Sequence, residues 1–158
     1  GKDSLFLTML RASGVNYAAN PVFQALRRIG VASAMDRSFV RVEAMLSSEQ
    51  AHRVLDDGPR YLLIDVAGKQ QMLMPAADLA RHLQTSKPET GQAIDLEAIP
   101  AVRLQLAPIE LQASLQEAWM VFEEHAAEAL VVRRMTAPGI HHVYGILTRH
   151  SVERAYRP

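Results

Sequence analysis

Apolar positions along the chain follow two patterns, short apolar runs typical of strands and wider stripes typical of helices, and the two alternate in a repeated order. The first series begins with a strand at 39–42, followed by a helix that starts after Ser47. Two further strands at 61–66 and 71–74 and a helix at 76–83 complete it. The strand at 61–66 is too apolar to face water on either side. The pattern therefore predicts the order strand, helix, strand, strand, helix.

A second series follows in the same order. Alternating apolar residues predict a strand at 102–106, and Ser114 begins a helix whose apolar stripe includes Trp119. A strand at 129–133 leads to a turn at 136–139. Both helices after the first strand begin with a capping-box pattern, in which a Ser precedes a Gln or Glu by three residues: Ser47 with Gln50, and Ser114 with Glu117.

The second series ends in a strand that runs directly into a helix, over 143–156. Thr148 offers a hydroxyl where that helix begins, and the helix N-terminus leaves N–H groups suited to an anion. A weaker copy of this corner lies at 72–83. The copy aligns Met74 with Leu147, Pro75 with Thr148 and Asp78 with Ser151.

The spacing of corresponding apolar residues supports an internal duplication. Val40 and Leu104 are 64 residues apart, Leu62 and Leu130 are 68 apart, and Leu73 and Ile146 are 73 apart. The first increase fits about one extra helical turn, and the second fits a longer hairpin loop.

Residues 1–36 do not belong to the repeat. Asp3 or Ser4 can cap a helix that ends near Gly14, and Asn20-Pro21 starts a second helix that Gly30 stops. The turn-rich stretch at 86–100 predicts a surface loop. We therefore expect four parts, which are a helical linker at 1–36, a first unit at 37–85, a connector at 86–100 and a second unit at 101–158.

Composition excludes several classes of protein. Equal numbers of basic and acidic residues, 17 of each, give no basic footprint for nucleic acid. The chain has no cysteine, so disulfides and thiolate metal sites are excluded. It lacks a signal-peptide pattern, and its apolar run at 5–10 is far shorter than the roughly 20 residues that span a bilayer. We expect a soluble chain in the cytoplasm.

The corner Gly145–Ser151 resembles the Gly-x-x-Thr-x-x-Asp corner of CBS domains, and the resemblance covers 37–157. It implies an α+β (α/β-like) fold with two tandem CBS domains related by pseudo-two-fold symmetry. It also implies a regulatory module whose cleft often holds an adenine nucleotide, and a chain that is not an enzyme.

The first 36 residues narrow the resemblance. The stretches at 3–17 and 29–37 resemble the linker between the last membrane helix and the CBS pair of bacterial ClC-type chloride channels and antiporters. This resemblance implies a cytoplasmic module of a voltage-gated channel or chloride/proton antiporter, on the inner side of the cell membrane. It also implies a homodimer, a membrane domain on the same chain as partner, and chloride bound only in that domain. The start at Gly1 suggests a fragment. The alternative is a CBS pair that senses adenine nucleotide and controls another transporter or an enzyme.

By resemblance, the candidate nucleotide-binding residues are Thr148, Ser151, Asp78 and Gly145, with ATP, ADP or AMP as ligand. The Thr hydroxyl would meet phosphate or ribose, and an acid three residues later would accept from the ribose hydroxyls. Each corner departs from this pattern, because Ser151 replaces the acid in one and Pro75 replaces the hydroxyl in the other. The alternative is structural: Thr148 caps its helix, and Asp78 is a first-turn acid favoured by the helix dipole.

Other chemistry is weakly indicated. His141 and His142 are adjacent on a predicted strand, where they point to opposite faces and do not easily share a metal ion. Trp119 and Phe122 could stack on a base, but their helical spacing favours a place in the core. No catalytic triad, paired carboxylates or Gly-rich phosphate loop has persuasive spacing. We expect neither a metal site nor an enzyme.

Overall fold

The computed structural model describes residues 6, 10, 19–101 and 103–156, and the chain forms two compact units. Arg37–Leu106 form one unit, here called the inserted unit. Gly1–Asp36 and Ala107–Pro158 together form the other, here called the outer unit. The N-terminal segment, expected to be a separate linker, therefore groups with the second half of the chain.

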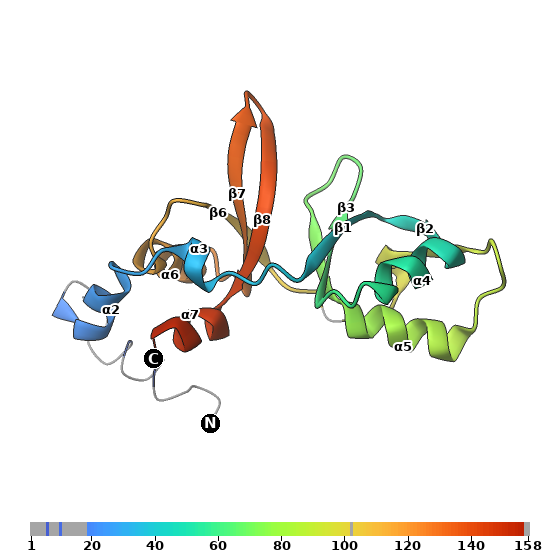
Figure 1. Ribbon diagram of the computed structural model, residues 1–158, viewed down its shortest axis with the longest axis horizontal. Helices are drawn as coiled ribbons and strands as arrows, with labels where there is room; N and C mark the ends of the chain where they lie inside the picture. Colours follow the sequence, from blue (N-terminus) through green and yellow to red (C-terminus); the bar gives the residue numbers. More distant parts are fainter. Residues whose placement is uncertain (1–5, 7–9, 11–18, 102, 157–158) are drawn as a thin grey trace. The chain divides into compact units, whose positions relative to one another are not determined.

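The inserted unit contains the first predicted series (Figure 1). Its elements are β1 (Phe39–Glu43), β2 (Met45–Ser47), α4 (Ser48–Asp56), β3 (Tyr61–Asp65), β4 (Met72–Pro75), α5 (Ala76–Ser86), β5 (Ala93–Asp95) and a 3-10 helix (Leu96–Ala98). β1 pairs with β3 in parallel and β3 pairs with β4 antiparallel, so the sheet order is β1-β3-β4. Alternate strand residues, including Val42, Leu62 and Ile64, pack on apolar residues of α5. The predicted order of strands and helices is confirmed here.

The central strand and the first cap of this unit behave as predicted. Leu62, Leu63 and Ile64 of β3 are all fully buried, as expected of a strand that faces water on neither side. The Ser47 hydroxyl accepts from the Gln50 N–H at 3.1 Å, and the Gln50 side chain accepts from the Ser47 N–H at 2.8 Å. The capping box thus satisfies two donors of the first turn of α4.

The surface loop expected at 86–100 is wrong in its second half. β5 pairs antiparallel with β2, and Ile94, Leu96 and Ile99 are buried in the core of the inserted unit. The turn-rich composition of 86–92 hid the three apolar side chains that follow it. They are spaced too irregularly to give a strand or helix period.

The outer unit contains the second series. Its elements are α2 (Pro21–Leu26), α3 (Val31–Ala34), β6 (Leu106–Glu110), α6 (Leu115–Glu124), β7 (Ala129–Ala137), β8 (Ile140–Thr148) and α7 (Arg149–Tyr156). The sheet order is β6-β7-β8, with β7 and β8 antiparallel. The strand, helix, strand, strand, helix order is confirmed in this unit too.

The first strand of this series lies later than predicted. β6 begins at Leu106, and Leu104 instead forms an antiparallel bridge with Leu73 of β4. Leu104 therefore lies along the edge strand of the inserted unit, a place that alternation in sequence cannot distinguish from a new sheet. Pro108 is tolerated in β6 because β6 is itself an edge strand.

The segment before Arg37 is built into the outer unit. Asn20 caps α2, accepting from the Val22 and Phe23 N–H groups at 2.8 and 3.3 Å, and Pro21 is the first helical residue, as predicted. The helix ends at Leu26 rather than near Gly30, and Gly30 instead precedes the short α3. The predicted first helix, over 5–10, lies outside the described residues apart from Phe6 and Leu10.

The core of the outer unit gathers side chains from both ends of the chain. Trp119 and Phe122 are fully buried, so the interpretation that they belong to the core is confirmed. Phe6, 3% exposed, packs edge-on against Trp119 and also contacts Tyr156 of α7, at ring distances of 6.2 and 5.3 Å. Leu10 is fully buried in the same core.

The two series differ in length at one place. Phe39 and Leu106, which begin the first strands, are 67 residues apart, and Tyr61 and Ala129, which begin the next strands, are 68 apart. The closing helices begin 73 residues apart, at Ala76 and Arg149. The extra length therefore lies in the β7–β8 hairpin, and it forms longer strands rather than the longer loop we expected.

Candidate functional site

The two strand-to-helix corners occupy the same position in their units. Each follows an edge strand, β4 or β8, and leads directly into a closing helix. Asp78 is the third residue of α5 and Ser151 the third of α7, and their exposures are 7% and 4%. The alignment of Asp78 with Ser151, made from sequence, matches their places in the fold.

In the outer unit, Thr148 and Ser151 bond to each other. The Thr148 Oγ1 accepts from the Ser151 N–H at 3.1 Å, and the Ser151 Oγ accepts from the Thr148 N–H at 3.3 Å. The two hydroxyls are also 2.9 Å apart, within hydrogen-bond distance. This reciprocal arrangement is a capping box with Ser in the place of Glu. The Thr148 hydroxyl therefore caps α7, as the structural alternative predicted.

In the inserted unit, Asp78 lies at a helix start that has no side-chain cap. Pro75 precedes α5, and the N–H of Ala76 donates to the Arg60 carbonyl at 3.0 Å. The Asp78 carboxylate pairs with Arg81 one turn later, at 3.0 Å, and its own helix dipole favours the negative charge. A depression of about 230 Å³ opens beside it, lined by Asp78, Arg81, His82, Thr85, Ile99 and Pro100.

Gly145 has a structural neighbour where a ligand contact was expected. A Cβ at this position would lie 2.7 Å from Cγ and 2.8 Å from Sδ of Met35, and 3.0 Å from the Asp36 carbonyl oxygen. The Asp36 N–H donates to Ile146 at 2.7 Å, and the Ile146 N–H donates back to Asp36 at 2.9 Å. Gly145 therefore lets the segment before Arg37 pair closely with β8. The sequence motif alone did not reveal this close contact.

Arg149, the first residue of α7, is a contact that sequence reasoning missed. Its guanidinium pairs with Glu123 at 2.6 Å and donates to the Phe122 and Ala127 carbonyls at 3.0 and 3.3 Å. It also lies 5.1 Å from the Trp119 ring centroid, a cation–π distance. A cation is disfavoured at the start of its own helix, but here it meets the C-terminal carbonyls of α6, where the dipole favours it.

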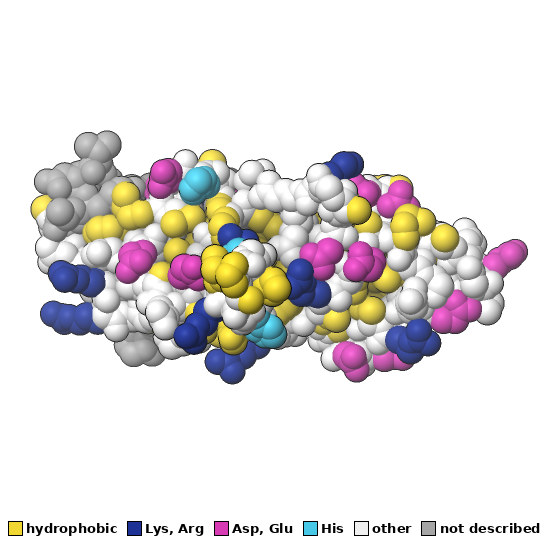
Figure 2. Space-filling view, turned by 90° about the horizontal axis from the view of Figure 1, so that it is seen from above, with side chains coloured by type: hydrophobic (Ala, Val, Ile, Leu, Met, Phe, Trp, Pro, Cys, Tyr) yellow, Lys and Arg dark blue, Asp and Glu magenta, His cyan; other side chains and the backbone are white. Residues whose placement is uncertain are grey.

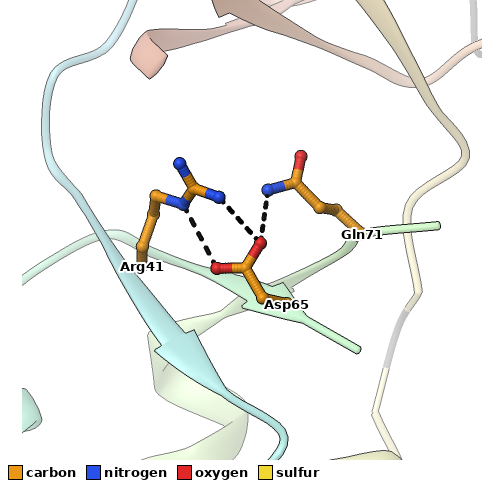
Figure 3. Close-up of polar contacts among 3 residues, drawn as sticks. All are labelled: Arg41, Asp65 and Gln71. Carbon is orange, nitrogen blue, oxygen red and sulfur yellow. Dashed lines mark hydrogen bonds and ion pairs between the residues drawn. The ribbon is translucent and has the colours of Figure 1, made fainter. Parts of the chain in front are cut away.

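A second polar cluster lies at the end of the parallel strand pair of the inserted unit (Figure 3). Arg41 donates twice to Asp65, from Nε at 3.2 Å and from Nη2 at 2.9 Å, and Gln71 donates to the same carboxylate at 2.7 Å. The Arg41 hydrogen bonds hold the pKa of Asp65 below its usual range, against a smaller opposing effect of burial. The cluster joins β1, β3 and the residue before β4, so it fixes this end of the sheet.

Metal and membrane features were also sought among the described residues. Within 19–101 and 103–156, together with residues 6 and 10, no three His, Cys, Asp or Glu side chains come together as a metal site would require. No helix in this part of the chain has the length and apolar character needed to cross a bilayer.

Solved structures place the fold. No protein-family model and no curated protein sequence matches the chain. The chain is similar to a CBS domain-containing protein of unknown function from Kribbella flavida, at 12% identity and a TM-score of 0.54, covering 80% of this chain and 99% of that one. It is also similar to a hemolysin-like protein containing a CBS domain from Oenococcus oeni, at 11% identity and a TM-score of 0.53, covering 87% and 96%. The chain therefore has the α+β fold of a tandem CBS domain.

Proposed function

We propose that the chain is a regulatory module without catalytic activity, and that it controls a ClC-type chloride channel or chloride/proton antiporter from the cytoplasmic side of the membrane. The observation that carries the regulatory part is the duplicated corner in a tandem CBS fold. Two closing helices begin at equivalent places, and each buries a polar side chain at its third residue, Asp78 or Ser151. Neither corner sets a nucleophile beside a general base, which supports a binding role over a catalytic one.

The ClC assignment rests on the resemblance of 1–36, and one structural feature supports it. Phe6, Leu10, Val22 and Phe23 are buried in the core of the outer unit, so the segment is fixed to the folded module. A rigid attachment of this kind can transmit a change in the module to whatever precedes it in the chain. Reading the genomic frame upstream of Gly1 tests the assignment. An upstream frame that encodes no membrane helices rejects it and favours a CBS pair that serves another transporter or an enzyme.

A second candidate function is the sensing of ATP, ADP or AMP. The placement of Asp78 and Ser151 at equivalent buried positions favours it, because the ribose-binding acid of the CBS corner belongs there. The Thr148–Ser151 bonds oppose it, since a ligand must compete with the cap for the Thr148 hydroxyl. We therefore expect weak nucleotide binding in the natural sequence.

Calorimetry with each nucleotide tests this second function, with a variant that restores the motif. Ser151→Asp supplies the missing carboxylate at a helix position where the dipole favours it. A charged hydrogen bond adds about 1–3 kcal/mol, so we expect affinity to rise roughly 5- to 150-fold. Thr148→Ala in the same background is the control and should abolish the gain. Binding that neither substitution changes would place the nucleotide elsewhere.

We also propose that the module forms a homodimer through its helices. Met120 on α6 is 43% exposed, although the apolar stripe of that helix is otherwise buried. Sedimentation of the 158-residue chain at tens of micromolar tests self-association. We expect a dimer that Met120→Lys weakens. A purely monomeric wild-type chain contradicts the proposal.

A further inference from the structure

The β7–β8 hairpin differs from its counterpart in the inserted unit. The counterpart joins β3, which ends at Asp65, to β4, which begins at Met72, through a polar loop containing Gly68 and Lys69. In the outer unit, both strands are nine residues long and only Pro138 and Gly139 separate them. The hairpin consequently extends well beyond α3, α6 and α7 of its own unit (Figure 1). The duplication does not require this extension, which is what prompts a search for its use.

The end of the hairpin is apolar and exposed. Met135 is 52% exposed and Ile140 is 60% exposed, and Ala137 and Pro138 lie between them in the chain. Gly139 has a φ of 75°, which allows the tight two-residue turn between the paired residues Ala137 and Ile140. We call residues 135–140 the hairpin tip.

Basic side chains flank the tip on both faces of the hairpin. Arg134 pairs across the strands with His142, and Met135 pairs with His141. Because neighbours along a strand point to opposite faces, Arg133 and Arg134 place one guanidinium on each face. Residues 129–148 contain no Asp or Glu, although the whole chain has a net charge of +0. Figure 2, seen from above, shows hydrophobic side chains at its centre beside basic and His side chains.

We propose that the hairpin tip inserts shallowly into an anionic lipid surface, with Arg133 and Arg134 at the level of the phosphate groups. The apolar side chains of the tip suit the boundary between headgroups and acyl chains, and the long arginine side chains can reach the phosphates beside it. The two-residue turn leaves few backbone groups without partners, which matters because lipid cannot satisfy them.

Lipid fits this surface better than a macromolecular partner does. The tip offers two large exposed apolar side chains, Met135 and Ile140, whereas a stable protein interface buries about 800 Å² on each side. Nucleic acid would match the arginines but leave the apolar side chains in water. Shallow insertion into a bilayer uses both features and needs no complementary pocket. The proposal does not depend on the ClC assignment.

Vesicle partitioning of the whole 158-residue chain tests the proposal. The probes are vesicles of phosphatidylcholine alone and of phosphatidylcholine mixed with phosphatidylglycerol, at low salt. Each arginine near an anionic surface contributes about five-fold, so we expect about 25-fold stronger partitioning to the mixed vesicles. The double variant Arg133→Gln/Arg134→Gln should lose that preference. Met135→Ser/Ile140→Ser should weaken binding to the mixed vesicles by roughly ten-fold, because less apolar surface leaves water.

A matched control exists in the same unit. Arg27 and Arg28 are another adjacent and exposed arginine pair, so Arg27→Gln/Arg28→Gln removes the same charge away from the hairpin and should leave partitioning unchanged. An equal loss in this control, or no preference for anionic vesicles in the wild-type chain, overturns the proposal. A change in sedimentation coefficient for the hairpin variants, without vesicle binding, assigns the tip to a second copy of the chain and overturns it too.

Fluorescence gives an independent measurement of insertion. Ile140→Trp places an indole at the exposed tip, while Trp119 is fully buried and provides a constant background. The emission should shift to shorter wavelength on anionic vesicles, and brominated acyl chains should quench it. Emission that does not respond to these vesicles rules out insertion of the tip.

Discussion

Met35 lies directly over Gly145, so close that a Cβ on the glycine would be 2.7 Å from the methionine Cγ. This contact accompanies the two hydrogen bonds between Asp36 and Ile146, which pair the chain before Arg37 with β8. The glycine that the CBS resemblance assigned to nucleotide binding therefore has a packing role in the outer unit. Its role as a ligand contact remains a prediction.

Gly145→Ala should destabilise the protein by roughly 1–3 kcal/mol, because the added methyl group forces Met35 or the Asp36 backbone to move. The midpoint of urea unfolding measures the effect. Gly30→Ala is the matched control, since its nearest neighbour is the Ala113 carbonyl at 4.0 Å and its φ is −84°. A second substitution, Met35→Ala, should recover part of the loss in Gly145→Ala. Equal midpoints for Gly145→Ala and Gly30→Ala would contradict the close contact.

The Thr148–Ser151 cap should be measurable as a coupling. Thr148→Ala should cost about 0.5–2 kcal/mol of unfolding free energy, the usual range for losing an N-cap. Ser151→Ala should cost a similar amount, because it leaves the Thr148 N–H without its acceptor. The double variant should cost less than the sum, since each substitution already breaks the shared bonds. Strict additivity would show that the two side chains act independently.

Arg149 should be more important for stability than the ion pair alone suggests. Arg149→Met should cost about 2–3 kcal/mol, because it leaves both a partly buried carboxylate and the Phe122 and Ala127 carbonyls with fewer donors. Glu123→Gln should cost less, since the amide oxygen still accepts and the carbonyl bonds remain. Arg154, exposed on the same helix, is the control, and Arg154→Met should be near neutral. Thermal or urea unfolding distinguishes the three, and a loss in Glu123→Gln as large as that in Arg149→Met counts against the carbonyl bonds.

The Arg41–Asp65 pair predicts a contribution that disappears in acid. Because the folded-state pKa of Asp65 is depressed, the pair stabilises the protein above the unfolded pKa of about 4 and loses that effect as pH falls below it. Both side chains are partly exposed, at 45% and 32%, so the contribution at neutral pH should be about 0.5–1 kcal/mol. Asp65→Asn should lower stability at pH 7 and should match the wild type more closely near pH 3. A difference that does not change with pH would exclude this linkage.

Phe6 should stabilise the outer unit selectively. Phe6→Ala removes a buried ring that contacts Trp119 and Tyr156, and should cost about 3 kcal/mol. Hydrogen exchange should quicken in α6 and α7, while β1, β3 and β4 keep their protection because they belong to the inserted unit. Val22→Ala, at another buried site of the same core, should give the same pattern with a smaller loss. Faster exchange in β3 alone would contradict this assignment of Phe6.

Local patterns in the sequence predicted much of the fold. The caps at Ser47, Asn20 and Ser114 form as expected, because a cap depends on residues within one turn of itself. The Glu117 side chain differs in one detail, since it accepts from the Ser114 hydroxyl at 3.5 Å. The order of strands and helices was also readable, since each apolar run is long enough to select one period.

Contacts between distant segments could not be read in the same way. Leu104 alternates with its neighbours like a strand residue, and nothing local indicates that it bridges to Leu73. Arg149 looks like an exposed residue of an amphipathic helix, and its partners Phe122 and Ala127 contribute only carbonyl groups, which have no signature in sequence. For the candidate site, sequence identified Thr148, Ser151 and Asp78, but it could not show that Thr148 and Ser151 bond to each other.

The interruption of the outer unit by Arg37–Leu106 has a consequence for biosynthesis. During translation the inserted unit is complete once its last residue leaves the ribosome, so it can fold early. Phe6 and Leu10 must wait for Trp119 and Tyr156, at the far end of the message, before their burial is possible. The nascent chain thus carries exposed apolar side chains near its start until synthesis is almost finished, which makes chaperone dependence a natural property of this arrangement.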